Sequence, residues 1–175
     1  MTTHSTSGKT LAGKNPKNSS VTMTEIVLPS HTNSLGTIFG GRVMAWIDIA
    51  AAISAGKHAR RVVVTASLDA LHFVAPIKLG HVVHIKATVN FAARTSMEVG
   101  VRVESENPLT GELTHTAKAY LTFVALDDHG RPTQVAPVIP ETPEEKRRLE
   151  QAKIRREARI KLADDLKKQG AQSVD

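Results

Sequence analysis

An aspartate stands in the middle of a segment that otherwise has the composition of a buried helix. Residues 40–58 are apolar on nearly every side. The positions three and four residues from Asp48 lie on its own helix face, and all are apolar: Met44, Ala45, Ala51 and Ala52. A charge among apolar neighbours is costly unless it is paired or hydrated. Two roles fit it: a carboxylate bonded to a nearby Ser or Thr, or a general base or nucleophile made more basic by desolvation.

An asparagine and three glycines lie around the start of this helix. Asn33 is a good amide donor, and Gly36, Gly40 and Gly41 bracket the expected helix start. Free N–H groups point outward at a helix N-terminus, and the helix dipole there favours negative charge. A carbonyl oxygen that becomes an oxyanion could bind at such a position. Each glycine alone also fits a tight strand-to-helix turn, so the combination with Asp48 is what indicates chemistry.

The spacing of these groups predicts a site shared by two chains. Gly41 and Asp48 are seven residues apart, which is roughly 10 Å along a helix and too far for both to act on one carbonyl. If two copies pair about a twofold axis with these helices antiparallel, Asp48 of one copy can approach Asn33 of the other. Small side chains on the helix would permit close packing: Ala50, Ala51, Ala52, Ser54 and Ala55.

The elements that must position these residues follow a mixed α+β pattern. A first strand is expected from Val21 to Leu28, followed by the helix at 40–58. Four segments rich in β-branched residues come next, several of them alternating between apolar and polar side chains: 61–76, 82–93, 96–106 and 113–127. The joints between them are short, at 77–81, 92–96 and 106–112, and therefore predict a four-stranded antiparallel meander. The helix must pack on one face of this sheet.

The two ends of the chain differ from this central part, which we assign to residues 21–135. Residues 1–20 are rich in Ser, Thr, Lys and Gly and are expected to form a disordered arm. Residues 136–175 are expected to form a charged helical extension, with Thr142 as its N-cap and acids in its first turn. The basic runs 146–148 and 155–156 fit either a solvated helix or the binding of ligand phosphates or nucleic acid.

Composition limits the possible functions. The 175 residues, 41% of them apolar, suit one domain with tails, and the absence of cysteine excludes disulfides and thiolate metal sites. This cysteine usage suits a cytoplasmic location. A net charge of +6 favours an anionic ligand, but aromatic residues make up only 3% of the chain, so nucleic acid is not expected as a partner. No apolar run is long enough to span a membrane, and no membrane partner is expected.

A family resemblance adds to this reading. The pattern N-x-x-G-x-x-x-G-G followed by M-x-x-x-D comprises Asn33, Gly36, Gly40, Gly41, Met44 and Asp48. It resembles the hotdog-fold acyl-CoA thioester hydrolases of the broad-specificity cytosolic type. The likeness extends over about residues 20–135, including the stretches VVTASLDALHFVAPIKLG and ARTSMEV. It implies a long helix lying in a curled antiparallel sheet, with homodimers that share two sites and often assemble as trimers of dimers.

The resemblance also implies a reaction and its residues. Asp48 would activate a water that hydrolyses the thioester of acyl-CoA, and Asn33 would orient the water or the carbonyl. Backbone N–H groups near Gly41 would polarise the carbonyl oxygen. Whether Asp48 acts as a base or forms an anhydride stays open, because both need the same geometry. Neither a metal nor a cofactor is expected, since coenzyme A is part of the substrate and product.

Coenzyme A bears phosphates, so basic loops near the site are candidates for binding it. The expected substrate-binding residues are Gly40 at the helix start, Lys57 and Arg60 after the helix, and the turn Arg94, Thr95 and Ser96. The SGKT at 7–10 is not interpreted as a phosphate loop, because the earlier glycine and strand are missing. Scattered histidines at 31, 72, 81 and 84 form no metal motif.

Two other functions fit the same fold. A non-catalytic acyl-CoA sensor would bind the ligand without cleaving it, but it would gain nothing from Asp48 and would be expected to have a DNA-binding helix pair, which is not found. A hotdog dehydratase would need a histidine beside an acid, and the helix has no histidine before position 58.

Overall fold

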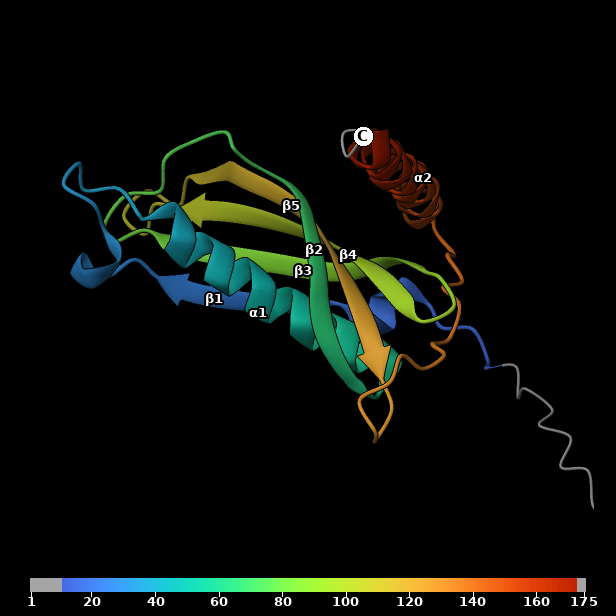
Figure 1. Cartoon of the computed structure of the whole chain (residues 1–175). Helices are drawn as coiled ribbons and strands as arrows, with labels where there is room; N and C mark the ends of the chain where they lie inside the picture. Colours follow the sequence, from blue (N-terminus) through green and yellow to red (C-terminus); the bar gives the residue numbers. More distant parts are fainter. Residues whose placement is uncertain (1–10, 173–175) are drawn as a thin grey trace, which may run out of the picture.

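The structure is a computed structural model that describes residues 11–172. A five-stranded antiparallel sheet wraps around one long helix, and a second long helix lies on the other side of the sheet (Figure 1). The strands are β1 (Val21–Ile26), β2 (Val62–Phe73), β3 (Val82–Ala92), β4 (Ser96–Glu106) and β5 (Leu113–Leu126). The α-helices are α1 (Gly40–Ala59) and α2 (Pro143–Gln172), and the short 3-10 helices are η1 (Pro16–Ser19) and η2 (Pro29–His31). The α+β architecture with a long central helix is thus confirmed.

The core lies between α1 and one face of the sheet. Alternate side chains of β3 and β4 are buried there, as their period of two predicts: Val83, Ile85, Ala87 and Val89, and Met97, Val99, Val101 and Val103. The helix contributes Val43 and Ile47 together with the small side chains of Ala50, Ala51 and Ala55. These alanines bring the helix close to the sheet. Because side chains alternate along each strand, the polar residues of β3 and β4 lie on the other face of the sheet.

The prediction of a four-stranded meander is wrong for β2. The strand order is β1-β3-β4-β5-β2, so β2 pairs with β5 at one edge instead of with β3. The segment 74–81 is not a hairpin turn, because it crosses the end of the sheet where α1 begins (Figure 1). There Ile38 N–H donates to the carbonyl of the buried Ile77, and Val27 N–H donates to the carbonyl of His81, both at 2.9 Å. These bonds place the start of β3 beside the end of β1.

The N-terminal segment also differs from expectation over the part that is described. Residues 1–10 lie outside the described residues, but 11–20 pack on the domain instead of forming an arm. The hydroxyl of the buried Ser19 accepts a 3.0 Å bond from Val89 N–H, and Lys14 Nζ donates to the carbonyl of His58 at 2.6 Å. Polar and backbone contacts hold this segment on the domain. Because its sequence has no apolar periodicity, its ordered structure was not predicted.

Helix α2 begins as predicted and lies against the face of the sheet opposite α1. Thr142 Oγ1 accepts from Glu145 N–H at 3.2 Å, and the Glu145 carboxylate accepts from Thr142 N–H at 3.0 Å, which forms a capping box. These backbone bonds, Thr142 first, hold the pKa of Glu145 below its ordinary value. Arg155 attaches the helix to the sheet through Glu98 of β4 at 2.7 Å. No helix within residues 11–172 is long and apolar enough to cross a membrane.

Candidate active site

Asp48 and Thr65 form the polar centre of the candidate site. Asp48 lies in the middle of α1, and Thr65 lies on β2, the strand at one edge of the sheet. Thr65 Oγ1 donates a 2.8 Å hydrogen bond to Asp48 Oδ1. This bond holds the carboxylate through one oxygen. The second oxygen has lone pairs that a water or a substrate group could use.

A β-bulge sets the direction of Thr65. The register of β2 against β5 shifts between Thr65, opposite Phe123, and Ser67, opposite Thr122, so Ala66 is an extra residue in β2. A bulge bends its strand and re-aims nearby side chains, and it often lies next to an active site. Thr65 was not among the site residues predicted from the sequence. Thr65 is two residues after the apolar Val63, so the alternation of the strand puts its hydroxyl on the same face as Val63. Nothing nearby in the sequence linked that hydroxyl to Asp48.

The expectation that Asp48 is buried does not hold for the single chain. Asp48 is half-buried, and apolar side chains on α1 around it are exposed. Phe39 is 54% exposed, Met44 43%, Ile49 49% and Ile53 46%. The helix is apolar on this side although no other element of the described chain covers it. The desolvation of Asp48 expected from the sequence therefore requires that a second surface cover this side of α1.

Asn33 organises the loop before the helix. Its Oδ1 accepts from Leu35 N–H at 2.9 Å, and its Nδ2 donates to Thr37 Oγ1 at 3.0 Å. Gly36 has a positive φ of 72°, which is readily available only to glycine in so tight a turn. The amide carries two N–H groups, and the contacts within the described chain use one of them. Asn33 thus fixes its own loop and retains donor capacity.

Gly40 and Gly41 form the first turn of α1. The N-cap residue, Phe39, provides no side-chain hydrogen bond, and the first turn has no acid, so the leading N–H groups are without side-chain partners. Two hollows flank this turn. One of about 330 Å³ includes Gly40 and Phe73 in its lining, and the other of about 290 Å³ includes His31 and Gly41. An anionic oxygen could bind at this helix start.

Helix α1 separates the predicted residues into two groups. Asn33, Gly40 and Gly41 lie at its N-terminal end, whereas Asp48 is eight residues further on, about 12 Å along the axis. The structure therefore does not bring Asp48 and Gly41 together within one chain. It brings Asp48 together with Thr65 of β2 instead.

The turn Arg94, Thr95 and Ser96 joins β3 to β4 on the Thr65 side of the sheet. Ser96 is opposite Val124, which is opposite Val64, so the turn is one row beyond Thr65 and two strands away. Two strand spacings amount to roughly 10 Å. The Arg94 side chain is exposed, and the carbonyls of Arg94 and Thr95 accept from Val135 and Ala125 N–H. These two bonds hold the turn in place, and the Arg94 side chain is an exposed cation at that end of the sheet.

The two basic residues after α1 differ from each other. Arg60 is the C-cap, is exposed and has a left-handed backbone with φ of 54°. Lys57 Nζ donates to the carbonyl of Ser20 at 2.6 Å and so attaches the N-terminal segment to the helix. The Arg60 side chain has no ion pair or hydrogen bond within residues 11–172 and could meet an anionic ligand, whereas Lys57 already has a structural partner.

The histidines have other partners. His31 packs edge-on against Trp46 with ring centroids 5.4 Å apart, and His84 bonds to Glu106 at 2.7 Å. Among the described residues, no group of three or more His, Asp or Glu side chains could hold a metal ion.

The family follows from comparison with known proteins. The Thioesterase superfamily profile matches residues 35–112. The chain is 46% identical over 129 residues to YkhA of Bacillus subtilis, named as an uncharacterized acyl-CoA thioester hydrolase, which covers 74% of this chain and 75% of that protein. The chain belongs to the hotdog-fold acyl-CoA thioesterase family. The family expectation drawn from Asn33, the glycines and Asp48 is thus confirmed.

Solved structures of this thioesterase family agree with the fold. A hexameric acyl-CoA thioesterase in its apo form has a TM-score of 0.85 and 47% identity, covering 87% of this chain and 98% of that one. An acyl-CoA hydrolase from Staphylococcus aureus, in complex with butyryl-CoA, CoA and CoA disulfide, has a TM-score of 0.84 and 39% identity, covering 93% and 99%. Variants of the S. aureus enzyme with one aspartate, threonine or asparagine changed to alanine also match, at 39% identity.

Proposed function

We propose that this protein hydrolyses acyl-CoA thioesters to free fatty acid and coenzyme A, with Asp48 activating the attacking water. The observation that supports this most is the 2.8 Å bond from Thr65 to Asp48 Oδ1. It orients a carboxylate beside an apolar helix face and leaves the other oxygen for a water. The water proton passes to Asp48 as the water oxygen attacks the carbonyl carbon, and the C–S bond then breaks as the thiolate leaves and takes up a proton.

The carbonyl oxygen becomes negative in this step. N–H groups at the start of α1, near Gly40 and Gly41, would stabilise that charge, and the free N–H of Asn33 would orient the water or the carbonyl. The alternative chemistry is attack by Asp48 itself to form an anhydride, which water then hydrolyses. A single turnover in heavy-oxygen water tests for the anhydride, because the label enters the Asp48 carboxylate only when water hydrolyses an anhydride at the aspartyl carbonyl carbon. Neither route requires a metal or a cofactor beyond the coenzyme A of the substrate.

The S. aureus variants support the choice of residues. Its substituted asparagine, aspartate and threonine are separated by fifteen and seventeen residues, the same spacing as Asn33, Asp48 and Thr65 in this chain. A match of three residue types at two separations is not expected by chance. Thr65, found here through its bond to Asp48, therefore joins the proposed site as the residue that positions the carboxylate.

A second copy of the chain would complete the site. The exposed apolar side of α1 and the outer edge of β2, which pairs with no strand in the described part of the chain, are surfaces that a partner would cover. Twofold pairing with antiparallel α1 helices would bring Asp48 of one protomer to Asn33 and Gly41 of the other. We propose a homodimer as the minimum and a trimer of dimers as the full assembly. A solved relative is a hexamer, which supports the latter.

Basic groups on two exposed segments would hold the phosphates of coenzyme A. The turn at Arg94, with Thr95 and Ser96, and the exposed Arg60 are the proposed contacts. Lys57 would take part only if it released the Ser20 carbonyl. We propose a cytoplasmic location, which is supported by the lack of cysteine and by relatives named as cytosolic hydrolases, 35% identical over 132 residues.

The Asp48→Asn variant tests the reaction. It keeps the size of the side chain and its acceptance of the Thr65 hydroxyl, but it removes the base and the nucleophile. We expect thiol release from a panel of acyl-CoAs of different chain length to fall by about 1,000-fold, while the oligomer and acyl-CoA binding stay intact. Unchanged thiol release in this variant would reject the mechanism. A wild-type protein that binds acyl-CoA without releasing thiol would instead be a regulatory binding protein.

A further inference from the structure

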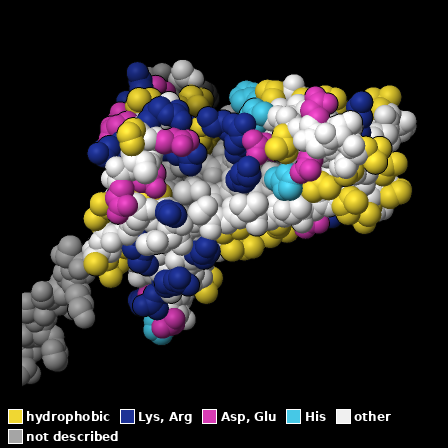
Figure 2. Space-filling view, turned by 180° about the vertical axis from the view of Figure 1, so that it is seen from behind, with side chains coloured by type: hydrophobic (Ala, Val, Ile, Leu, Met, Phe, Trp, Pro, Cys, Tyr) yellow, Lys and Arg dark blue, Asp and Glu magenta, His cyan; other side chains and the backbone are white. Residues whose placement is uncertain are grey.

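A further cavity lies away from α1, between helix α2 and the opposite face of the sheet. Its volume is about 190 Å³. The sheet provides one wall and the first half of α2 provides the other, and its polar lining includes Lys86, Arg102, Lys118, Glu144, Arg147, Arg148 and Arg155. Figure 2 shows Lys and Arg side chains gathered on α2 and on the sheet beside it. The basic runs of the C-terminal helix thus meet basic residues of three strands.

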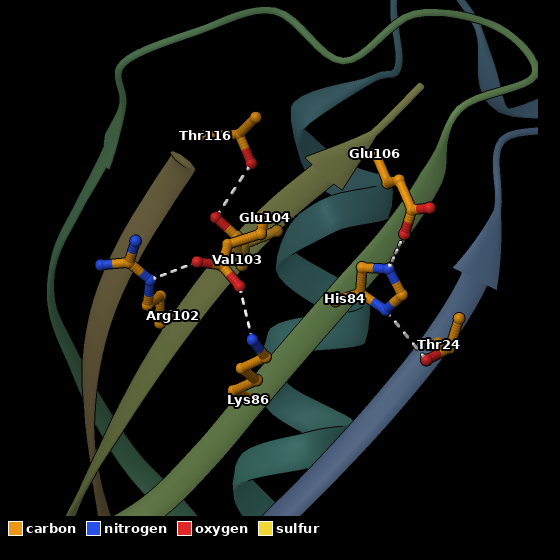
Figure 3. Close-up of polar contacts among 8 residues, drawn as sticks. All are labelled: Thr24, His84, Lys86, Arg102, Val103, Glu104, Glu106 and Thr116. Atoms are coloured by element: carbon orange, nitrogen blue, oxygen red, sulfur yellow. Dashed lines mark hydrogen bonds and ion pairs between the residues drawn. The ribbon is translucent and has the colours of Figure 1, made fainter. Parts of the chain in front are cut away.

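The charges in this cavity do not balance. The ion pairs of the described chain give its six cations only three carboxylates. Glu104 pairs with both Lys86 and Arg102, at 2.6 and 2.7 Å (Figure 3). Glu144 pairs with Arg148 at 2.6 Å and with Arg147 at 3.8 Å, and Glu98 pairs with Arg155. Lys118 has no acid partner within residues 11–172 and lies 5.2 Å from the centre of the Tyr120 ring. An excess of three positive charges is left facing the cavity.

The cationic groups are held in place before any ligand binds. Arg155 makes two hydrogen bonds to Glu98, which is 2% exposed, and its guanidinium stacks 3.6 Å above the Tyr120 ring. Hydrogen bonds from Lys86 first and then from Arg102 keep the pKa of Glu104 below its ordinary value, so this carboxylate stays charged and fixes both cations. A fixed guanidinium loses little freedom when it binds an oxyanion.

Residue 100, a glycine on the sheet wall of the cavity, leaves room for the Asn90 side chain. A Cβ at this position would lie 2.5 Å from Asn90 Nδ2, and Asn90 in turn donates to Glu98 at 3.3 Å. A side chain at position 100 would therefore collide with Asn90 and disturb the Glu98 anchor. A larger hollow of about 410 Å³ adjoins the cavity and shares Lys118, Tyr120 and Arg155 with it. The anion-sized cavity thus opens into space for a larger organic group.

We propose that the cavity under α2 binds phosphate groups, as inorganic pyrophosphate or as the diphosphate of a nucleotide. Arg and Lys groups of both walls would contact the phosphate oxygens. The cations face a narrow space between two layers, which suits a small ligand and not a nucleic acid, whose phosphates need an open basic stripe. The proposal is independent of the thioesterase reaction, because the cavity and Asp48 lie on opposite faces of the sheet.

Calorimetric titration of the full-length protein with pyrophosphate tests this site. Wild type is compared with a Lys118→Met/Arg147→Gln variant, since these two cations have the weakest internal pairing and their loss should leave the fold intact. Lys153→Met is the matched control: Lys153 is also on α2 and pairs with Glu150 at 2.8 Å, but it lines neither hollow. We expect saturable binding that weakens with salt and falls at least about tenfold in the double variant only. Thiol release is measured in parallel.

The outcomes are separable. Absence of pyrophosphate binding to wild type at millimolar concentration, or equal affinity in wild type and the double variant, would overturn the proposal. An equal loss in Lys153→Met would do the same, because it would mean attraction to general positive charge. Competition of pyrophosphate by ADP and by coenzyme A in wild type then identifies the source: competition by both points to the substrate's own nucleotide, and competition by ADP alone points to a free nucleotide. Loss of thiol release in Asp48→Asn bears on the reaction and leaves this result unaffected.

Discussion

The hydroxyl of Thr65 donates to Asp48 at 2.8 Å and so joins the edge strand β2 to the middle of helix α1. The two residues are seventeen positions apart in sequence. A bulge at Ala66 lies immediately after Thr65, so the strand is bent where the hydroxyl must reach the helix. The carboxylate thus has a defined orientation before substrate arrives.

We predict that Thr65→Val lowers kcat by about 100-fold while KM changes little, because a misdirected carboxylate loses its alignment with the water. Valine keeps the shape and β-propensity of threonine, so the strand should be undisturbed. Thr65→Ser, which restores the hydroxyl, should recover most of the activity. The measurement is steady-state thiol release for the three proteins. Equal kcat in Thr65→Val and wild type would leave this hydrogen bond without a catalytic role.

Mixing two inactive variants tests whether the site is shared between protomers. Asp48→Ala and Asn33→Ala homodimers should each be inactive. If Asp48 of one protomer works with Asn33 of its partner, refolding the two variants together produces heterodimers with one intact site, and about a quarter of wild-type activity returns. If one protomer contained the whole site, the mixture would stay inactive. Sedimentation of the mixture confirms that dimers have formed.

The elements near the site could be predicted because their signals are local. The apolar run of 40–58 predicted α1, and the alternation in 82–93 and 96–106 predicted β3 and β4 with the correct buried faces. The residue types and spacing of Asn33, the glycines and Asp48 were enough to find the family. All of this information lies within short windows of the chain.

What the sequence did not reveal depends on contacts between distant residues. The position of β2 beside β5 follows from backbone bonds of the crossing segment 74–81, which have no periodic signature. The link from Thr65 to Asp48 depends on that position. Lys57 has the right charge to bind a phosphate, but its ammonium group already donates to the carbonyl of Ser20, 37 residues away. Residue type indicates what a side chain can bind, whereas its partner is set by the tertiary fold.

The buried His58 predicts a dependence of stability on pH. Burial is the main cause that lowers the pKa of His58 below its ordinary value of 6.5, opposed by its bond to the Ala136 carbonyl. The unfolded chain therefore binds this proton first as the pH falls below about 6.5, and the free energy of unfolding decreases until the folded pKa is passed. The slope from one group is at most about 1.4 kcal/mol per pH unit.

The His58→Gln variant removes this titration and retains a donor for the Ala136 carbonyl. We expect its free energy of unfolding, measured in urea between pH 5 and 7, to change less with pH than that of wild type. The other seven histidines are the same in both proteins, so the difference between the two curves isolates His58. Parallel curves would contradict the assignment.

The ion pair of Arg155 with Glu98 predicts how α2 is attached to the sheet. Glu98 is 2% exposed, so Arg155→Met leaves a buried carboxylate without its cation and should lower the free energy of unfolding by about 3 kcal/mol. Replacing both residues, as Glu98→Leu/Arg155→Met, removes the buried charge and should restore most of the loss. Arg156→Met is the control, since Arg156 is the next residue of α2 and forms no ion pair within the described chain.

Thermal and urea unfolding of these variants distinguish attachment from mere charge removal. If Arg155→Met and Arg156→Met were equally stable, the pair would contribute nothing measurable, and α2 would be held by its other contacts, such as the buried Ala152. If the double variant were no more stable than Arg155→Met, the loss would come from the Tyr120 stacking instead of the unpaired Glu98. In either case thiol release should be unchanged, because α2 and Asp48 are on opposite faces of the sheet.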